Sequence, residues 1–301
     1  MEKVSEEFFV KAPWGKIALI AWGNPSLEPV MMVHGRQDSA ATFIQLVNKL
    51  PNTHYYVGVD LPGNGKSDPY PKGLAVNRYH LVAVVEVIVK HMGWSSFIFM
   101  GHSMGCEVGL FYNAVWPGVI SKFIHLDAGP TFQRLQQPDH QKFYRHYYER
   151  FYGNYHRYNS GVGKTYTKQE ALAAVMKARG LTEDQAQVIL SRNMVRVGED
   201  CYRFSWDPRV KYIVPQNTTN ELYIYLFTYN VPPSFLISMS EGHAGVFRGK
   251  NGADELIAEM VAAGCQRVIL NGGHDHHLTN PEEIAKYVDK FLNKELVKSK
   301  I

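Results

Sequence analysis

The spacing of hydrophobic and polar residues predicts a parallel β-sheet interleaved with helices. Four short apolar runs come first, "EFFVKAP", "KIALIAWG", "PVMMVHG" and "YYVGVDLPG". The last two are continuous apolar runs that end at glycine-rich loops, as strands buried on both faces of a parallel sheet do. Next come a helical stretch over 77–93, the strand "FIFMGHS", a helix reaching Trp116 and the strand "KFIHLDAGP". This alternation indicates an α/β fold.

The alternation stops in the middle of the chain. Residues 131–230 show helical periodicity without a buried strand, and "SFLISMSEG" and "RVILNGG" then resume the sheet. An amphipathic helix over 281–298 follows, and Pro281 suits its first turn. We therefore expect a core domain made of residues 1–130 and 231–301, with a helical cap, residues 131–230, inserted into it.

Composition and charge narrow the function classes. The chain has 301 residues, of which 45% are hydrophobic, so it can bury a large core. Its net charge of +4 comes from interspersed Lys and Arg without a long basic run, so we expect no nucleic-acid partner. Cys106, Cys201 and Cys265 form no CxxC pair, which predicts neither a disulfide framework nor a thiolate metal site. The sequence shows no signal peptide or membrane span and predicts a cytoplasmic protein.

A serine stands at the junction between a predicted strand and a predicted helix, in "FIFMGHSMGCEVGL". In this Gly-x-Ser-x-Gly pattern, Gly101 and Gly105 let the backbone turn sharply, so that Ser103 projects above the sheet edge. The free N–H groups of the following helix point to the place where an oxyanion would form. This context predicts that Ser103 is a nucleophile.

A serine nucleophile needs a base, and the stretch "RVILNGGHDHHLTNPEE" offers three histidines. His274 follows two glycines at the exit of the last predicted strand, and we predict that it is the base. His276 and His277 are expected to seat the helix that follows. A histidine-rich metal site lacks companion ligands at suitable spacing, so we expect neither a metal nor a cofactor.

These stretches resemble the α/β-hydrolases, and specifically the serine hydrolase-like proteins of animals. The resemblance is carried by "VKAPWGKIALIAWG", "MMVHGRQDSAATFIQLVNKLP", "YYVGVDLPGNGKSD", "GHSMG" and "GGHDHHLTNPEE", and also by "RFSWDPRV" in the cap. It implies an α/β-hydrolase fold with a mostly parallel central sheet and a helical cap insertion. One departure is Asn64, which stands in a structural loop where relatives commonly have histidine.

The resemblance implies that "HGRQDS" forms half of the oxyanion hole. The backbone N–H of Arg36 would join that of Met104 in binding the developing negative charge. The Arg36 side chain is then a candidate contact for an anionic group at the pocket mouth, or a solvated loop residue. His34 of "HGRQDS" and His102 of "GHSMG" are candidate substrate contacts.

The acid of the triad has two candidates. Many α/β-hydrolases carry it after the strand that follows the cap, where "FLISMSEGHAG" offers Glu241. The other known location is the strand before the cap, where "KFIHLDAGP" ends in Asp127. We keep both, with Asp127 slightly favoured.

The cap carries the available information on substrate. "KFYRHYYERFYGNYHRY" places Phe143, Tyr147 and Phe151 on one helical face. Such a stripe commonly packs a core, but in a cap its rings also have access to a pocket over the nucleophile. Phe143 and Tyr147 are therefore candidate substrate contacts, and a small to medium hydrophobic ester is the expected substrate.

Two function hypotheses follow. The first is a cofactor-free, carboxylesterase-like serine hydrolase that works through a Ser-His-acid triad and an acyl-enzyme. The alternative is a non-catalytic ligand-binding protein on the same scaffold, because fold does not fix function.

The last three residues, Ser299-Lys300-Ile301, resemble the peroxisomal signal Ser-Lys-Leu. They predict a peroxisomal import receptor as a partner, against the alternative of a lysine-rich helix end.

Overall fold

An eight-stranded sheet forms the centre of the molecule in the computed structural model, which describes residues 3, 5–135, 139–161, 163–240 and 253–293. The strands are β1 (Ser5–Ala12), β2 (Gly15–Trp22), β3 (Pro29–Val33), β4 (Tyr55–Val59), β5 (Phe97–His102), β6 (Ile120–Leu126), β9 (Ser234–Met239) and β10 (Gln266–Leu270). Each strand expected from the apolar runs is present.

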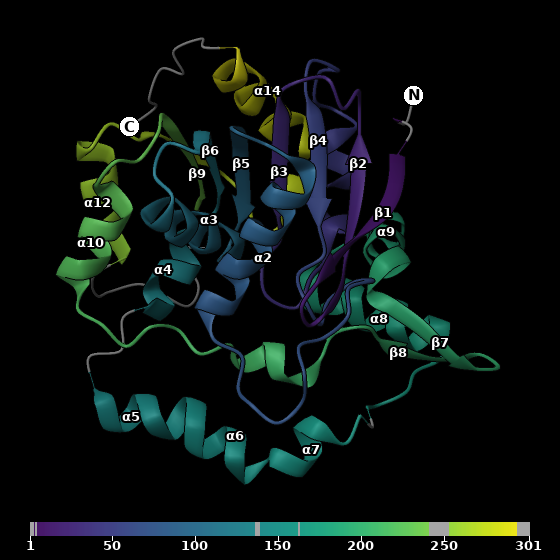
Figure 1. The fold of residues 1–301 in the computed structure, drawn as a ribbon. Helices are drawn as coiled ribbons and strands as arrows, with labels where there is room; N and C mark the ends of the chain where they lie inside the picture. Colours follow the sequence, from purple (N-terminus) through teal and green to yellow (C-terminus); the bar gives the residue numbers. More distant parts are fainter. Residues whose placement is uncertain (1–2, 4, 136–138, 162, 241–252, 294–301) are drawn as a thin grey trace.

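The strand order is β1-β2-β4-β3-β5-β6-β9-β10 (Figure 1). Within this sheet the β1–β2 and β2–β4 pairs are antiparallel, and its other described pairs are parallel. The register aligns the carboxyl ends: Val33 at the end of β3 pairs with Gly101 of β5, and Leu126 at the end of β6 pairs with His102. The loops that follow these strands therefore meet at one edge of the sheet, where ligands bind in open α/β folds.

Helices cover both faces of the sheet because alternate strand residues point to opposite sides. In β3, Met31 and Val33 pack toward one helical layer, whereas Val30 and Met32 pack toward the other. The first layer contains α2 (Arg78–Met92), α3 (Met104–Val115), α10 (Asn220–Thr228) and α12 (Ala253–Ala262). The second contains η1 (Ala40–Phe43), α1 (Ile44–Val47) and α14 (Pro281–Leu292).

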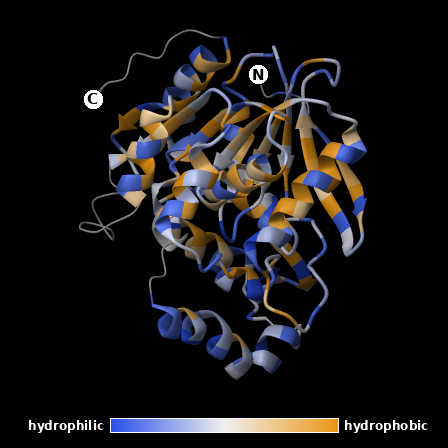
Figure 2. Cartoon of the chain, turned by 60° about the vertical axis from the view of Figure 1, so that its left-hand side comes forward, coloured by the Kyte–Doolittle hydropathy of each residue, from blue (hydrophilic) through white to orange (hydrophobic). Residues whose placement is uncertain are grey.

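The helix boundaries follow local sequence signals. An Asn77 capping box starts α2, and Gly93 ends it in the left-handed conformation, as the pattern over 77–93 predicts. Helix α14 ends at Leu292, before residue 298, where the hydropathy pattern placed its end. Figure 2 shows apolar residues concentrated on the strands of the sheet.

The described part of the segment between β6 and β9 adds no strand to the central sheet. Its elements are α4 (Gly129–Leu135), α5 (His140–Tyr144), the π-helix η2 (Arg145–Glu149), α6 (Arg150–Gly153), α7 (Tyr155–Asn159), α8 (Lys168–Arg179), α9 (Glu183–Asn193), β7 (Met194–Gly198), β8 (Cys201–Phe204), η3 (Pro208–Tyr212) and α10. Besides the expected helices it contains the antiparallel hairpin β7–β8, in which β7 is mostly exposed and β8 is half-buried. Its first and last helices, α4 and α10, pack against α12 and α3 of the core layer.

The middle of this segment covers the edge of the sheet at which the carboxyl ends of the parallel strands meet (Figure 1). Helices α5, α6 and α7 form an outer row, and α8 and α9 pack as a pair with their own apolar cluster, which includes Leu278 of the short helix α13 (His276–Thr279). The division into a core and an independent cap stays a prediction. No helix among the described residues is long and apolar enough to cross a membrane.

Candidate active site

Ser103 occupies the sharp turn that the glycine pattern predicts. It lies between β5 and α3 with φ 51° and ψ −118°, a conformation that L-residues rarely adopt. A Cβ on Gly105 would lie 2.0 Å from the carbonyl oxygen of Val33, and one on Gly101 would lie 2.5 Å from the backbone nitrogen of Cys106. Backbone atoms cannot move aside as a flexible side chain does, so both positions require glycine.

Asp127 and His274 form a direct pair at the same edge. The Nδ1 atom of His274 lies 2.6 Å from Oδ2 of Asp127, whose side chain is buried. The other oxygen, Oδ1, accepts a hydrogen bond from the backbone N–H of Met239 at 3.0 Å. The carboxylate is thus held from two sides, and it favours the His274 tautomer that carries its proton on Nδ1.

A cavity of about 650 Å³ opens above Ser103, and His274 lines it as well. Gly35, Arg36 and Met104 also line it, so both predicted oxyanion-hole residues border the same space. Helices α8 and α9 and the end of β8 form its apolar wall, which contains Ala174, Val175, Ala178, Ile189, Phe204 and Trp206. The cavity therefore brings a serine, a histidine and an apolar surface together.

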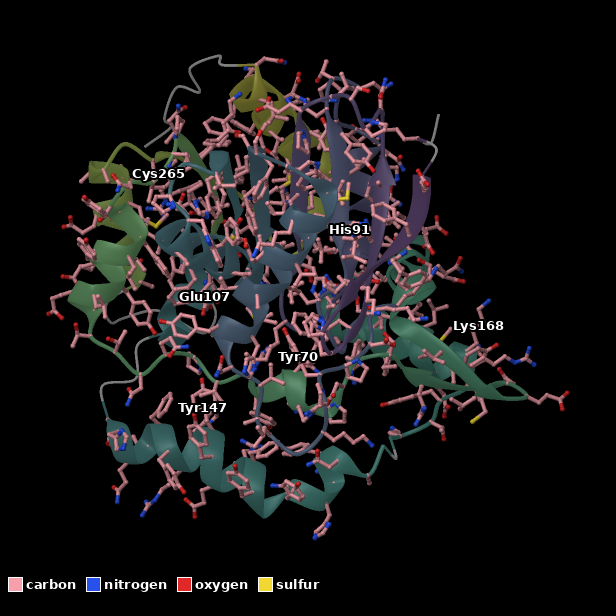
Figure 3. The ribbon with its side chains drawn as sticks, in the orientation of Figure 1. Tyr70, His91, Glu107, Tyr147, Lys168 and Cys265 are labelled. Carbon is pink, nitrogen blue, oxygen red and sulfur yellow. The ribbon has the colours of Figure 1, made fainter. Side chains whose placement is uncertain are left out.

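Two predicted substrate contacts from the cap lie elsewhere. Phe143 and Tyr147 do not line this cavity; they are buried in a separate cluster with Val214, and their ring centroids lie 5.1 Å apart. Figure 3 shows Tyr147 on the outer helical row. The aromatic stripe packs that row onto the protein, whereas α8 and α9 cover Ser103. A substrate contact at Phe143 or Tyr147 stays a prediction from the sequence, and this packing does not favour it.

His34 is also a structural residue and does not line the cavity. It is fully buried, its Nδ1 donates to the carbonyl of Gly35 at 2.6 Å, and its Nε2 accepts from the backbone N–H of Leu61 at 3.0 Å. Burial lowers the pKa of His34, which keeps the ring neutral and suits one donor and one acceptor. The ring therefore fixes the loop that carries Arg36.

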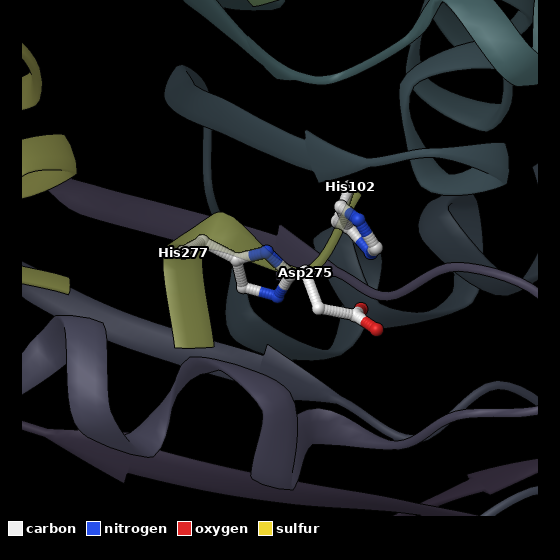
Figure 4. Close-up of side chains that lie close together, drawn as sticks. All are labelled: His102, Asp275 and His277. Atoms are coloured by element: carbon white, nitrogen blue, oxygen red, sulfur yellow. The ribbon is translucent and has the colours of Figure 1, made fainter. Parts of the chain in front are cut away.

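His102 lines the cavity and belongs to a cluster of ionisable groups, and its contact with a substrate stays a prediction. Figure 4 shows His102, Asp275 and His277 close together, and one donor atom from each lies within 4.8 Å of the others. The sequence shows no companion metal ligands at suitable spacing for the His-rich loop. The fold brings His102, at the end of β5, next to Asp275 and His277 of that loop. One nitrogen of each histidine has a protein partner: His102 Nε2 bonds the His274 carbonyl at 3.1 Å, and His277 Nε2 bonds Thr42 Oγ1 at 2.7 Å. The buried Nδ1 of His102 has no hydrogen-bond partner among the described residues.

The guanidinium of Arg179 lies beside this cluster, where a metal cation would otherwise balance the charge of Asp275. Arg179 of α8 binds both oxygens of Asp275, at 2.9 and 2.6 Å, and one oxygen of Asp38 at 3.0 Å. Burial alone would raise the pKa of Asp275, but Arg179 outweighs it and holds that pKa well below its usual range. Because this cation satisfies Asp275, the donor set fits an ion-pair network better than a metal site.

Arg36 lies at the cavity with an exposed side chain, and its Nη1 donates to the carbonyl of Lys211 at 3.2 Å. Two further predictions, Glu241 and Ser299-Lys300-Ile301, lie outside the described residues and stay sequence predictions.

Sequence reasoning missed four residues that line the cavity. Arg78 and Arg179 line the cavity from helices far apart in the chain, and no local pattern announces them. Phe204 and Trp206 stack at 4.3 Å with nearly parallel rings. They belong to "RFSWDPRV", whose alternate aromatic residues are a signal for a strand with one apolar face.

Comparisons with known proteins identify the fold family of the chain. A family model described as the alpha/beta hydrolase fold matches residues 28–299. The chain is 27% identical to a "Serine hydrolase-like protein" of Danio rerio, over 97% of this chain and 90% of that protein, and 25% identical to one of Mus musculus, over 95% of each.

Solved structures share the architecture. A hypothetical protein from Pseudomonas aeruginosa PAO1 superposes with a TM-score of 0.81 at 21% identity, covering 96% of this chain and 100% of that one. The thioesterase domain from the curacin biosynthetic pathway superposes with a TM-score of 0.74 at 17% identity, covering 95% and 99%. At these identities the likeness concerns the fold.

Proposed function

The chain belongs to the α/β-hydrolase fold family, and from that premise we propose that it is a carboxylesterase-like serine hydrolase that cleaves an ester or related acyl bond. One observation carries the proposal: Ser103, on a strained turn, and His274, paired with Asp127 at 2.6 Å, line the same cavity. A strained serine next to an oriented histidine is the arrangement that nucleophilic acyl transfer requires.

In the proposed mechanism, Ser103 Oγ attacks the carbonyl carbon of the substrate while His274 Nε2 takes its proton. Asp127 holds the imidazole by accepting from Nδ1–H and stabilises the imidazolium that forms. The backbone N–H groups of Arg36 and Met104 bind the oxyanion. Met104 is the first residue of α3, where a helical N–H has no acceptor within the helix. His274 then protonates the leaving alcohol, and water clears the acyl-enzyme by the same steps.

The apolar wall supports a substrate with a hydrophobic part. Val175, Ile189, Phe204 and Trp206 face a cavity of about 650 Å³, which is within the range of small-molecule sites. We propose an ester with a small to medium acyl or alcohol group.

A fluorophosphonate probe tests the proposal because it reacts only with an activated serine. The wild-type protein should be labelled at neutral pH, and Ser103→Ala should not. The same two proteins are assayed with p-nitrophenyl esters of increasing chain length. A folded wild-type protein that is neither labelled nor active on any ester would refute the proposal and favour a ligand-binding role.

A further inference from the structure

Arg78 is a buried cation on the wall of the Ser103 cavity. It is the first residue of α2, only 4% of its surface is exposed, and it lines the cavity together with Ser103 and Met104. Its backbone is fixed, because its N–H donates to the carbonyl of Val214 at 3.0 Å beside a parallel bridge between Asn77 and Val214. A charged side chain held at such a position needs a partner.

The counter-ion of Arg78 is Glu107, which does not satisfy all the hydrogen-bond donors of the guanidinium. The Arg78 Nε lies 3.3 Å from Oε1 of Glu107, an ion pair that does not have hydrogen-bond geometry. Among the described residues, Arg78 Nε and Nη1 donate no hydrogen bond, and Glu107 Oε1 accepts none. Thr131 donates to the other Glu107 oxygen at 2.9 Å. A guanidinium has five donors, so most of its hydrogen-bonding capacity is unused.

Two further features favour an anion next to Arg78. A cation at a helix N-terminus opposes the helix dipole, and α2 has 15 residues. Glu107, labelled in Figure 3, is fully buried, and burial raises its pKa although Arg78 opposes the shift. The counter-ion of Arg78 is therefore a weak one.

The other arginines of the cavity are differently placed. Its described lining residues include three arginines and two aspartates, and both aspartates bind Arg179. Arg36 is exposed to solvent. Among these three arginines, Arg78 is the one that is buried and whose single counter-ion, Glu107, leaves hydrogen-bond donors unused. Its single positive charge matches a monoanion better than a dianion.

We propose that Arg78 binds a carboxylate of the substrate, so that the enzyme acts on esters that carry an acidic group within reach of Ser103. The proposal rests on the proposed serine hydrolase function and narrows its substrate class. The planar guanidinium matches a carboxylate in shape, and the apolar wall holds the chain between the carboxylate and the ester.

The test compares p-nitrophenyl monoesters of linear dicarboxylic acids, four to eight carbons long, with the same compounds whose free carboxyl is methylated. The paired compounds have the same leaving group and differ in charge. The ratio of kcat/KM for the acid to kcat/KM for its methyl ester, after subtraction of the uncatalysed rate, should exceed 10 at the best chain length. Arg78→Met should lower this ratio about tenfold or more, the loss expected for a charge-assisted contact.

Glu107→Gln gives the decisive second variant. It removes the competing carboxylate and keeps Arg78, so the ratio should rise severalfold. Arg157→Met is the matched arginine control, because its side chain is exposed and does not line the cavity, and it should change the ratio less than threefold. If the Arg78–Glu107 pair only holds α2 and α3 together, both variants lower the Tm and neither changes the ratio, which overturns the proposal. If Arg36→Met loses the preference for the free acid over its methyl ester and Arg78→Met keeps it, Arg36 binds the carboxylate and the proposal is wrong.

A binding measurement separates this inference from the proposed function. Monomethyl adipate should bind Ser103→Ala at least tenfold more tightly than dimethyl adipate does, as measured by calorimetry without turnover. Equal binding refutes the carboxylate site even if the wild-type protein hydrolyses neutral esters. Selective binding with no hydrolysis of any ester keeps the site and refutes the hydrolase proposal.

Discussion

His274 and Asp127 lie 147 residues apart in the chain, and their side chains approach to 2.6 Å at the carboxyl edge of the sheet. Asp127 directly follows β6 and has φ 48°, so the backbone turns as it leaves the strand. This turn and the Met239 N–H aim the carboxylate at the imidazole.

Asp127→Asn should lower kcat by up to ~10⁴, because the amide no longer favours the His274 tautomer with its proton on Nδ1. Glu241→Gln is the control from the other candidate position and should retain turnover of a p-nitrophenyl ester. Both are measured at pH 7 on folded protein. A severe loss in Glu241→Gln with an active Asp127→Asn would assign the acid to Glu241.

The neighbouring histidines should separate into two roles. His276 is buried and its Nε2 lies 2.8 Å from Glu283 of α14, so His276→Ala should lower the free energy of unfolding while the folded enzyme keeps turning over. His274→Ala should abolish turnover, and its urea midpoint should stay near that of the wild type. The reverse result would show that the base is misassigned.

Gly105→Ala should destabilise the protein by more than about 4 kcal/mol or abolish serine labelling, because its Cβ would lie 2.0 Å from the Val33 carbonyl oxygen. Gly153→Ala is the matched control, since nothing lies within 4 Å of the new Cβ at this helical position. It should stabilise the protein by roughly 0.5–1 kcal/mol. Urea denaturation measures both, and near-equal midpoints would contradict the role given to the turn.

Arg179→Met should cost roughly 3–5 kcal/mol, because it leaves Asp38 and Asp275 without their counter-ion. The low folded-state pKa of Asp275 contributes stability that is present above its unfolded pKa of about 4 and is lost as pH falls through the folded value. The variant should lose this contribution at neutral pH, so its stability should fall less on acidification than that of the wild type. Arg179→Lys should be intermediate; a fully stable Arg179→Met would show that the ion pairs are unimportant.

His125 should make stability depend on pH. It is fully buried against Phe123, its nitrogens have no hydrogen-bond partner among the described residues, and burial lowers its pKa to about 3. Below its unfolded pKa of about 6.5 the unfolded chain binds a proton that the native ring does not, so stability falls as pH falls from 6.5 toward 3.

His125→Leu should remove up to about 1.4 kcal/mol per pH unit from that slope. Urea unfolding at pH 7, 6 and 5 measures it, and the exposed His156→Gln is the control that should leave the slope unchanged. An unchanged slope in His125→Leu would contradict the assignment.

The sequence by itself determined the features that local chemistry specifies. The strand order along the chain, the helix over 77–93 and the turn at Ser103 follow from hydrophobic period, capping residues and glycine spacing, all of which act within a few residues.

Only the tertiary structure decided which distant groups meet. It placed Asp127 against His274, buried Phe143 and Tyr147 away from the cavity, and brought Arg78 and Arg179 into its wall. The physical reason is that parallel strands bring loops far apart in the chain to one edge. Which helices cover that edge depends on packing of whole segments, and short-range patterns carry no information about it.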